Sequence, residues 1–326
     1  MILADLIILA ISMLVLSNSA SLVVQSSLKL SSYFNISQIA IGFLLIAIST
    51  SLPELSLSVT SSIAGEGALS AGDVFGSNTA NILLILGIGA FFYNGIKISE
   101  KNLREIGIIL LLTTLISVYI IYSSAIEKRG LGFFEGIILL SIFAVYVYGK
   151  LKKKNHLEEG YNGETITKKM ALNAFVMFCS GVIAIIISSA FVVSSAISIS
   201  EFFGIAHSFI GATIIAIGTS LPELSTTIYA LKNKHYGIVL GNIAGSNITN
   251  LGLVFGVALS INPIMLHLPV FIATLLFAVA ANTILFYAAA VNKGIGRIAG
   301  AIFLLIFIVY LITIFGLQLN ELAPII

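Results

Sequence analysis

The feature that most constrains this chain is the recurrence of apolar runs long enough to cross a lipid bilayer. Of its 326 residues, 58% are hydrophobic and 9% are charged, and the mean hydropathy is +1.11. An ordinary soluble domain carries about 25% charged residues, so a soluble enzyme, a nucleic-acid binder and a disordered protein are all excluded. Because about 20 apolar residues span a bilayer as one helix, the composition predicts a polytopic membrane protein with room for roughly ten crossings.

The apolar runs are continuous, whereas a membrane β-barrel would show short segments of alternating hydrophobicity. We therefore predict an all-α membrane protein with ten transmembrane helices. The expected spans cover residues 2–27, 36–63, 71–93, 103–123, 131–149, 170–197, 204–231, 238–260, 268–291 and 296–317. No basic region precedes the first run, so we expect it to be a retained span rather than a cleaved signal peptide.

Lysine and arginine predict the orientation, because short loops rich in these residues stay on the cytoplasmic side. With the N-terminus outside, 14 of the 16 basic residues fall in inside loops, and only Lys128 and Arg129 fall outside. Both termini are thus expected outside. The longest polar stretch, 150–169, becomes a cytoplasmic linker between residues 1–149 and 170–326. The short loops favour a prokaryotic plasma membrane.

The two parts resemble each other when the sequence is shifted by 169 residues. Residues 41–56 and 210–225 are then identical at 12 of 16 positions, and both contain Thr-Ser-Leu-Pro-Glu-Leu-Ser. The same shift aligns 72–81 with 241–250, which share Gly-Ser-Asn-x-x-Asn. Each half holds five predicted spans, and an odd number turns the second half upside down. Inverted repeats of this kind are typical of secondary transporters, whose site lies at the midplane between the halves.

Glu54 and Glu223 occupy equivalent positions inside predicted spans. A carboxylate at the bilayer centre costs roughly 3 kcal/mol even on lenient scales, so a matched pair indicates a functional site rather than a structural one. Each is preceded directly by a proline, Pro53 or Pro222, in a chain with only five prolines. Proline breaks a helix and frees backbone carbonyls, which can coordinate a cation where they line a cavity.

The second shared motif supplies further oxygens. Ser77 and Asn81 are four residues apart, and so are Ser246 and Asn250, so each pair can share one helix face. The glycines of the motif are also spaced four apart, which predicts close approach of another helix. They are Gly72 and Gly76 in the first half and Gly241 and Gly245 in the second. Asp73 has Asn242 as its repeat mate, and we expect it to open a helix near the outer face, with an auxiliary cation site as the alternative.

The clustered residue types predict the ligand. Carboxylates, amides and hydroxyls, with no histidine or cysteine among them, suit hard cations such as Ca²⁺, Mg²⁺ or Na⁺. Two glutamates neutralise one divalent ion, and a dry cage favours Ca²⁺ over the more strongly hydrated Mg²⁺. The single cysteine, Cys179, lies in an apolar run, and we expect neither a disulfide nor a resident cofactor.

On these motifs the chain resembles the cation/Ca²⁺ antiporter superfamily, in its sodium/calcium exchanger branch. The resemblance covers essentially the whole chain. It implies ten spans, alternating access in which the first and sixth spans slide against the others, and Ca²⁺ export driven by Na⁺ entry, with a monomer sufficient. The ligands implied by the resemblance are the side chains of Glu54, Glu223, Thr50, Ser51, Thr219, Ser220, Ser77, Asn81, Ser246 and Asn250, with the backbone carbonyls of Ala47 and Ala216.

The chain departs from many members of that family, which carry an acid where Asn81 or Asn250 stands. The counter-ion therefore stays open between Na⁺ and H⁺, and the Thr-Ser-Leu-Pro-Glu motif favours Na⁺ because the proton-coupled branch has a different sequence there. A passive cation channel and an intramembrane hydrolase are further alternatives. No Gly-x-Gly-Asp or His-Glu-x-x-His motif supports the hydrolase, so we expect the chain not to be an enzyme.

Overall fold

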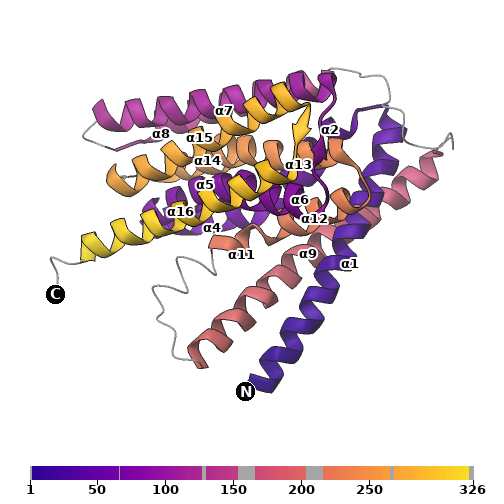
Figure 1. Ribbon diagram of the computed structural model, residues 1–326, viewed down its shortest axis with the longest axis horizontal. Helices are drawn as coiled ribbons and strands as arrows, with labels where there is room; N and C mark the ends of the chain where they lie inside the picture. The colour runs from indigo at the N-terminus through magenta and orange to yellow at the C-terminus, as the bar shows by residue number, and fades with distance from the viewer. Residues whose placement is uncertain are drawn as a thin grey trace.

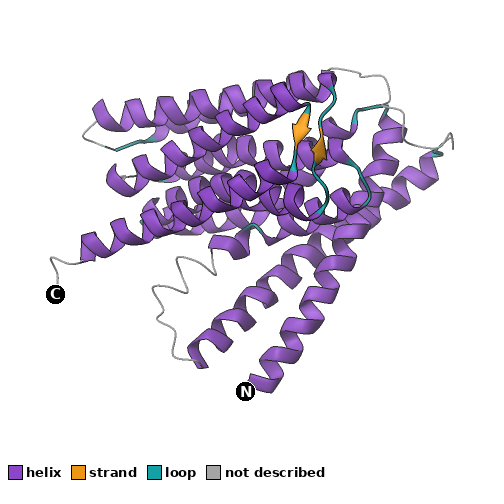
Figure 2. Ribbon diagram, viewed as in Figure 1, coloured by secondary structure: helices purple, strands orange, loops and turns teal. Residues whose placement is uncertain are grey.

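The computed structural model describes residues 2–65, 67–126, 130–152, 166–202, 216–264 and 268–322. Nearly all of them are helical, which confirms the predicted all-α class (Figure 2). Two short strands, β1 (Ile96–Lys97) and β2 (Gly294–Ile295), pair antiparallel at one end of the bundle.

Among the described residues, six helices run unbroken (Figure 1). They are α1 (Ile2–Phe34), α7 (Glu100–Ile126), α8 (Phe133–Lys152), α9 (Lys168–Phe202), α15 (Leu268–Asn292) and α16 (Arg297–Leu322). Their outward faces expose large apolar side chains, such as Phe134 and Ile298, each 80% exposed. Such a surface needs an apolar solvent, as a bilayer provides.

Four further segments are helices interrupted along their length, and they carry the repeated motifs. The first contains α2 (Gln38–Ile41), the π-helical turn η1 (Gly42–Ala47), α3 (Ile48–Thr50) and α4 (Leu52–Ile63). The next contains α5 (Gly67–Ala80), η2 (Asn81–Leu86) and α6 (Gly87–Phe92). Their counterparts are α11 (Ala216–Thr219) with α12 (Leu221–Lys232), and α13 (Tyr236–Thr249) with η4 (Asn250–Val254) and α14 (Phe255–Ile261).

The predicted proline breaks are present. Ser51 leaves the helical conformation at φ −82°, ψ 9°, and the axis bends by 43° between 38–50 and 52–63. Ser220 adopts nearly the same angles, φ −87° and ψ 5°, between α11 and α12. In both places the proline is the second residue of the following helix and lacks the N–H that an unbroken helix needs.

By length and composition, eight described helices can cross a membrane, or nine if the bent pair 38–63 is one span. The predicted span 204–231 begins among residues outside the described ranges, so the count of ten stays a prediction. Lys128, Arg129 and most of the predicted linker 150–169 also lie outside those ranges. Several ends differ from expectation, since α1 continues to Phe34 and α9 to Phe202.

Helices α1 and α9 pack side by side, running in opposite directions, and one end of the pair projects away from the main bundle (Figure 1). The Ser198 hydroxyl near the end of α9 donates to Asp5 near the start of α1 at 3.0 Å. Further along, Gly181 lies so close to Ser19 and Val23 that a Cβ there would meet the Val23 side chain at 2.8 Å. The 169-residue shift aligns these two helices, and an inverted second half would make them run in opposite directions, as they do.

The core lies where α5 and α13 cross the other broken helices, and α13–α14 is buried along nearly its whole length. The predicted close approach holds for the second-half glycines only. A Cβ on Gly241 would strike the Ile39 carbonyl, and one on Gly245 would meet Phe43 at 2.8 Å. The same prediction is wrong for Gly72, which has nothing within 4 Å, and for Gly76, where the nearest atom, the hydroxyl of Tyr310, is at 3.6 Å.

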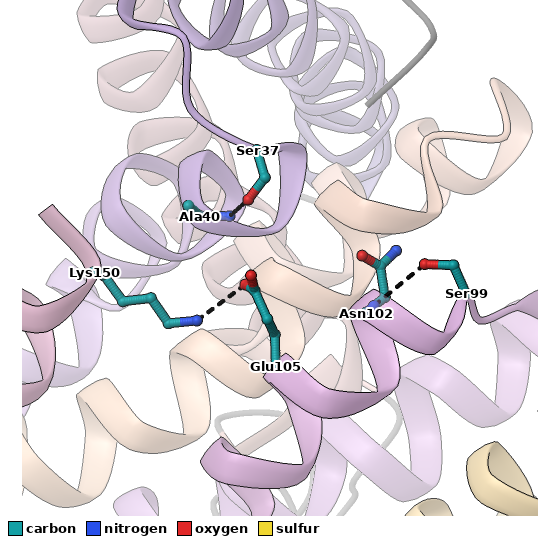
Figure 3. Close-up of polar contacts among 6 residues, drawn as sticks. All are labelled: Ser37, Ala40, Ser99, Asn102, Glu105 and Lys150. Atoms are coloured by element: carbon teal, nitrogen blue, oxygen red, sulfur yellow. Dashed lines mark hydrogen bonds and ion pairs between the residues drawn. The ribbon is translucent and has the colours of Figure 1, made fainter. Parts of the chain in front are cut away.

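Three segments predicted to face the cytoplasm meet at one end of the bundle (Figure 3). Lys150 at the end of α8 donates to Glu105 on α7 at 3.0 Å, and both side chains are largely buried. Ser37 accepts from Ala40 at the start of α2, and Ser99 accepts from Asn102 at the start of α7. The ion pair brings the end of α8 against the start of α7, and the membrane face of these ends stays a prediction.

Candidate ion-binding site

The two glutamates lie at the centre of the molecule and are almost completely excluded from solvent. Glu54 on α4 is 0% exposed and Glu223 on α12 is 1% exposed. Each stands one turn after its helix break, so the breaks set the position of both carboxyl groups. The two are near enough for their charges to interact. Two buried carboxylates side by side need compensation by a cation or by protons.

The hydrogen bonds around the glutamates are unequal. Glu223 Oε1 accepts from the Ser246 hydroxyl at 3.2 Å and from the Ser51 hydroxyl at 3.5 Å. Glu223 Oε2 and both carboxylate oxygens of Glu54 have no hydrogen-bond partner among the described residues. Buried oxygens without donors are uncommon in native structures, and oxygens of this kind suit a hard cation.

Four asparagines form a reciprocal network between the halves. The amide of Asn78 donates to the Asn247 carbonyl at 3.1 Å, and the amide of Asn247 donates to the Asn78 carbonyl at 3.3 Å. Asn81 then donates to Asn247 Oδ1 at 3.0 Å, and Asn250 donates to Asn78 Oδ1 at 3.1 Å. The exchange follows the 169-residue repeat on both sides.

This network determines which way the amides of Asn81 and Asn250 point. Their nitrogens are used as donors, and Oδ1 of each has no partner in the part of the chain that the structure describes. A flipped amide would set oxygen against oxygen, so the orientation is fixed by hydrogen bonding. These two amide oxygens and three carboxylate oxygens of the glutamates are therefore buried without a hydrogen-bond donor among the described residues.

The predicted hydroxyl ligands lie on the broken helical segments that also carry the glutamates and asparagines. Ser220 donates to Ser77 at 3.3 Å across the two halves. Thr50 donates to the Ala47 carbonyl at 3.3 Å, and the same carbonyl accepts from the backbone of Ser51 at 3.1 Å. The backbone of Ala216 begins α11, and its side chain lies outside the described part.

The expectation that Asp73 opens a helix is wrong. Helix α5 begins at Gly67, and Asp73 lies in its middle, 9% exposed, with Oδ1 accepting from the Thr219 hydroxyl at 3.1 Å. Residues 67–70, which precede the predicted start of the span at 71, already belong to α5, so Asp73 lies beyond its first turn.

The sequence reasoning also missed Asn78 and Asn247 as positioning residues. Their identity across the repeat was the available signal. The π-helical turns η2 and η4, which start at Asn81 and Asn250, had no signal in the apolar pattern. Such turns are frequent at functional sites.

The described residues hold no group of three or more His, Cys, Asp or Glu placed to bind a metal ion. The site instead combines two carboxylates with amide and hydroxyl oxygens. Buried carboxylates beside broken helices in a helical membrane protein define a membrane ion transporter.

The sequence matches the family described as sodium/calcium exchanger protein over residues 5–152 and 173–316. The chain belongs to this family, as the motifs in its two halves had indicated. Two similar proteins carry the name sodium/calcium exchanger, and exchangers are transporters, which is consistent with the expectation that the chain is not an enzyme.

Two curated relatives and one solved structure illustrate the similarity. An uncharacterised membrane protein of Methanocaldococcus jannaschii is 31% identical over 286 residues, covering 88% of this chain and 90% of the relative. The sodium/calcium exchanger MaX1 of Methanosarcina acetivorans is 26% identical over 351 residues, covering 97% and 99%. A structure of the sodium-calcium exchanger NCX_Mj, soaked with 10 mM Na⁺ and no Ca²⁺, superposes with a TM-score of 0.80 at 26% identity, covering 95% and 98%.

Proposed function

We propose that this chain is a secondary antiporter that exchanges Na⁺ for Ca²⁺ across the plasma membrane by alternating access. The observation that carries the proposal is the buried pair Glu54 and Glu223, three of whose four carboxylate oxygens lack a partner among the described residues. One Ca²⁺ balances the two charges, and Na⁺ ions can replace it on the same hard oxygens. The printed names of MaX1 and NCX_Mj support these two ions as substrates.

The proposed architecture is ten spans in two inverted halves, 1–149 and 170–326, joined by a cytoplasmic linker at 150–169, with both termini outside. The antiparallel contact of α1 with α9 and the reciprocal asparagine bonds support it. Because Cys179 is the only cysteine, replacing it and adding single cysteines at the ends would test the orientation by accessibility to an impermeant thiol reagent.

The proposed ligands come from both halves. They are Glu54, Glu223, Asn81, Asn250, Thr50, Ser51, Thr219, Ser220, Ser77 and Ser246, with the carbonyls of Ala47 and Ala216. A site built from both halves changes its access when the halves move, and the bare glutamate pair is too costly to reorient without a cation. This requirement couples the two ion fluxes and prevents a leak.

Na⁺ is favoured over H⁺ as the counter-ion because positions 81 and 250 are amides, which do not titrate. The alternative is a Ca²⁺/H⁺ antiporter, or an antiporter of another cation, using the same site.

The test is radioactive Ca²⁺ uptake into proteoliposomes loaded with Na⁺ and diluted into Na⁺-free buffer, beside a matched pH gradient. We expect uptake driven by the Na⁺ gradient alone. Uptake driven only by the pH gradient would establish the alternative, and uptake without any counter-ion gradient dependence would indicate a channel.

A further inference from the structure

Asp73 belongs to a polar stripe that reaches beyond the proposed site. Asp73, Ser77 and Asn81 are spaced four residues apart along α5 and η2, so they share one face. Each side chain contacts the second half. Thr219 donates to Asp73 at 3.1 Å, Ser220 donates to Ser77 at 3.3 Å, and Asn81 donates to Asn247 at 3.0 Å.

The carboxyl group of Asp73 is buried and only half satisfied. Its residue is 9% exposed, and Oδ2 has no hydrogen-bond partner in the described ranges. No ion pair among the described residues involves it. Its charge is near enough to interact with that of Glu54. A third buried acid beside two glutamates has no evident structural compensation.

The repeat mate of Asp73 performs a different task. The Asn242 amide donates to the carbonyl of Glu223 at 3.3 Å and to the hydroxyls of Thr226 and Thr227, each at 3.0 Å. An ionised carboxylate has no hydrogen to donate, so Asp73 does not copy this role. Because Asp73 lies in the middle of α5, it does not serve as an N-terminal helix residue either.

We propose that Asp73 is a third cation-binding carboxylate of this chain, and that with the Thr219 hydroxyl it holds one monovalent cation beside the glutamate pair. One carboxylate with one hydroxyl supplies a single negative charge, which suits Na⁺ better than a second Ca²⁺. The identification of the cation as Na⁺ rests on the proposed exchange function. Asp73 then sets how strongly Na⁺ competes, while the glutamates set Ca²⁺ binding.

The test is Ca²⁺/Ca²⁺ exchange by the full chain in proteoliposomes, measured with radioactive Ca²⁺ and inhibited by increasing Na⁺, with choline maintaining ionic strength. Asp73→Asn is expected to leave the half-saturating Ca²⁺ concentration within about twofold. The half-inhibiting Na⁺ concentration is expected to rise about tenfold, corresponding to about 1.4 kcal/mol, and the Hill slope to fall.

Asp5→Asn is the matched control, because Asp5 also accepts one serine hydroxyl, from Ser198 at 3.0 Å, but lies at the far end of α1. It should leave both ion dependences unchanged. An unchanged Na⁺ curve for Asp73→Asn would overturn the proposal. Equal weakening of Ca²⁺ and Na⁺ would also overturn it, because Asp73 would then act only through the glutamate pair.

If Asp73→Asn does not fold, Thr219→Val serves as the test instead, because it removes the hydroxyl group of Thr219 at nearly constant side-chain volume. It is expected to raise the half-inhibiting Na⁺ concentration about threefold, and no shift would contradict the proposal. Wild-type exchange that is insensitive to Na⁺ would overturn both the Na⁺ coupling and this inference. If Na⁺ inhibits exchange by the wild type, and the two variants show the same Na⁺ inhibition curve as the wild type, this inference alone would be overturned.

Discussion

The two halves share their motifs but use them differently around the cation site. Glu223 accepts hydrogen bonds from Ser51 and Ser246, whereas neither oxygen of Glu54 has a partner among the described residues. In the second half Gly241 packs against the backbone of Ile39 and Gly245 packs against Phe43 and Ala47, whereas Gly72 and Gly76 have room around them. The repeated sequence therefore preserves the types of ligand, while the surroundings of these residues differ between the halves.

Neutralising either glutamate gives the largest expected effect on transport. Glu54→Gln and Glu223→Gln should each reduce Ca²⁺ exchange more than a hundredfold, since removing one buried charge costs about 3 kcal/mol or more. Radioactive Ca²⁺ exchange in proteoliposomes measures this loss. Wild-type flux in either variant would show that the glutamate is not a ligand.

The same two variants should also differ in melting temperature, which compares the surroundings of the two glutamates. Without Ca²⁺ and Na⁺, Glu54→Gln should raise the melting temperature more than Glu223→Gln, because the carboxylate of Glu54 accepts no hydrogen bond from any described residue. Thermal unfolding in a chelator checks this order. Equal shifts would mean that the two carboxyl groups have equivalent surroundings.

The glycines test the packing difference. Gly245→Ala should lower the free energy of unfolding by about 1–3 kcal/mol, because its Cβ would meet the side chains of Phe43 and Ala47 at 2.8 and 2.9 Å. Gly72→Ala is the control and should be neutral, or stabilising by up to about 1 kcal/mol, because it fills open space in a helix. Similar losses for both would contradict the asymmetry.

Changing one amide to an acid tests the reciprocal network. The nitrogen of Asn250 donates to Asn78 Oδ1 at 3.1 Å, and an aspartic acid can make this bond only while it carries a proton. Exchange by Asn250→Asp should therefore fall several-fold as the pH rises, whereas wild type should change little. Asn81→Asp should behave alike, since Asn81 donates equivalently to Asn247. A pH-independent Asn250→Asp would place this amide outside the network.

The smallest effects are expected from the serines at the helix breaks. Ser51→Ala removes a hydrogen-bond donor from Glu223 and should raise the half-saturating Ca²⁺ concentration about threefold to tenfold, because hydrogen bonds to charged groups are stronger than those to neutral groups. Ser220→Ala removes a bond to the neutral Ser77 and should have less than half that effect. Ca²⁺ titrations of exchange distinguish them, and a larger loss for Ser220→Ala would reverse the comparison.

Much of the fold could be predicted from the sequence because the bilayer restricts backbone structure to helices of nearly constant length. The apolar runs therefore located the long helices, and Pro53 and Pro222 located the breaks at Ser51 and Ser220. Helix ends were less accurate, since apolar residues continue outside the bilayer, as in α1 and α9.

The candidate site could also be predicted from the sequence, for a related reason. A buried carboxylate is too costly to occur twice at matched positions without a function, so Glu54 and Glu223 stood out by their equivalent places inside predicted spans. Matching the two motifs then assembled serines and asparagines far apart in the chain. The π-helical turns at Asn81 and Asn250 were not predictable, because they depend on packing rather than on hydrophobic periodicity.

The class of protein, the helical breaks and the types of ligand could be read from the sequence, because each follows from the cost of polar groups in an apolar solvent. The orientation of the asparagine amides, the unequal bonding of the glutamates and the hydrogen bond from Thr219 to Asp73 required the three-dimensional structure. These depend on contacts between the two halves, and residues that are identical in the repeat meet different neighbours there.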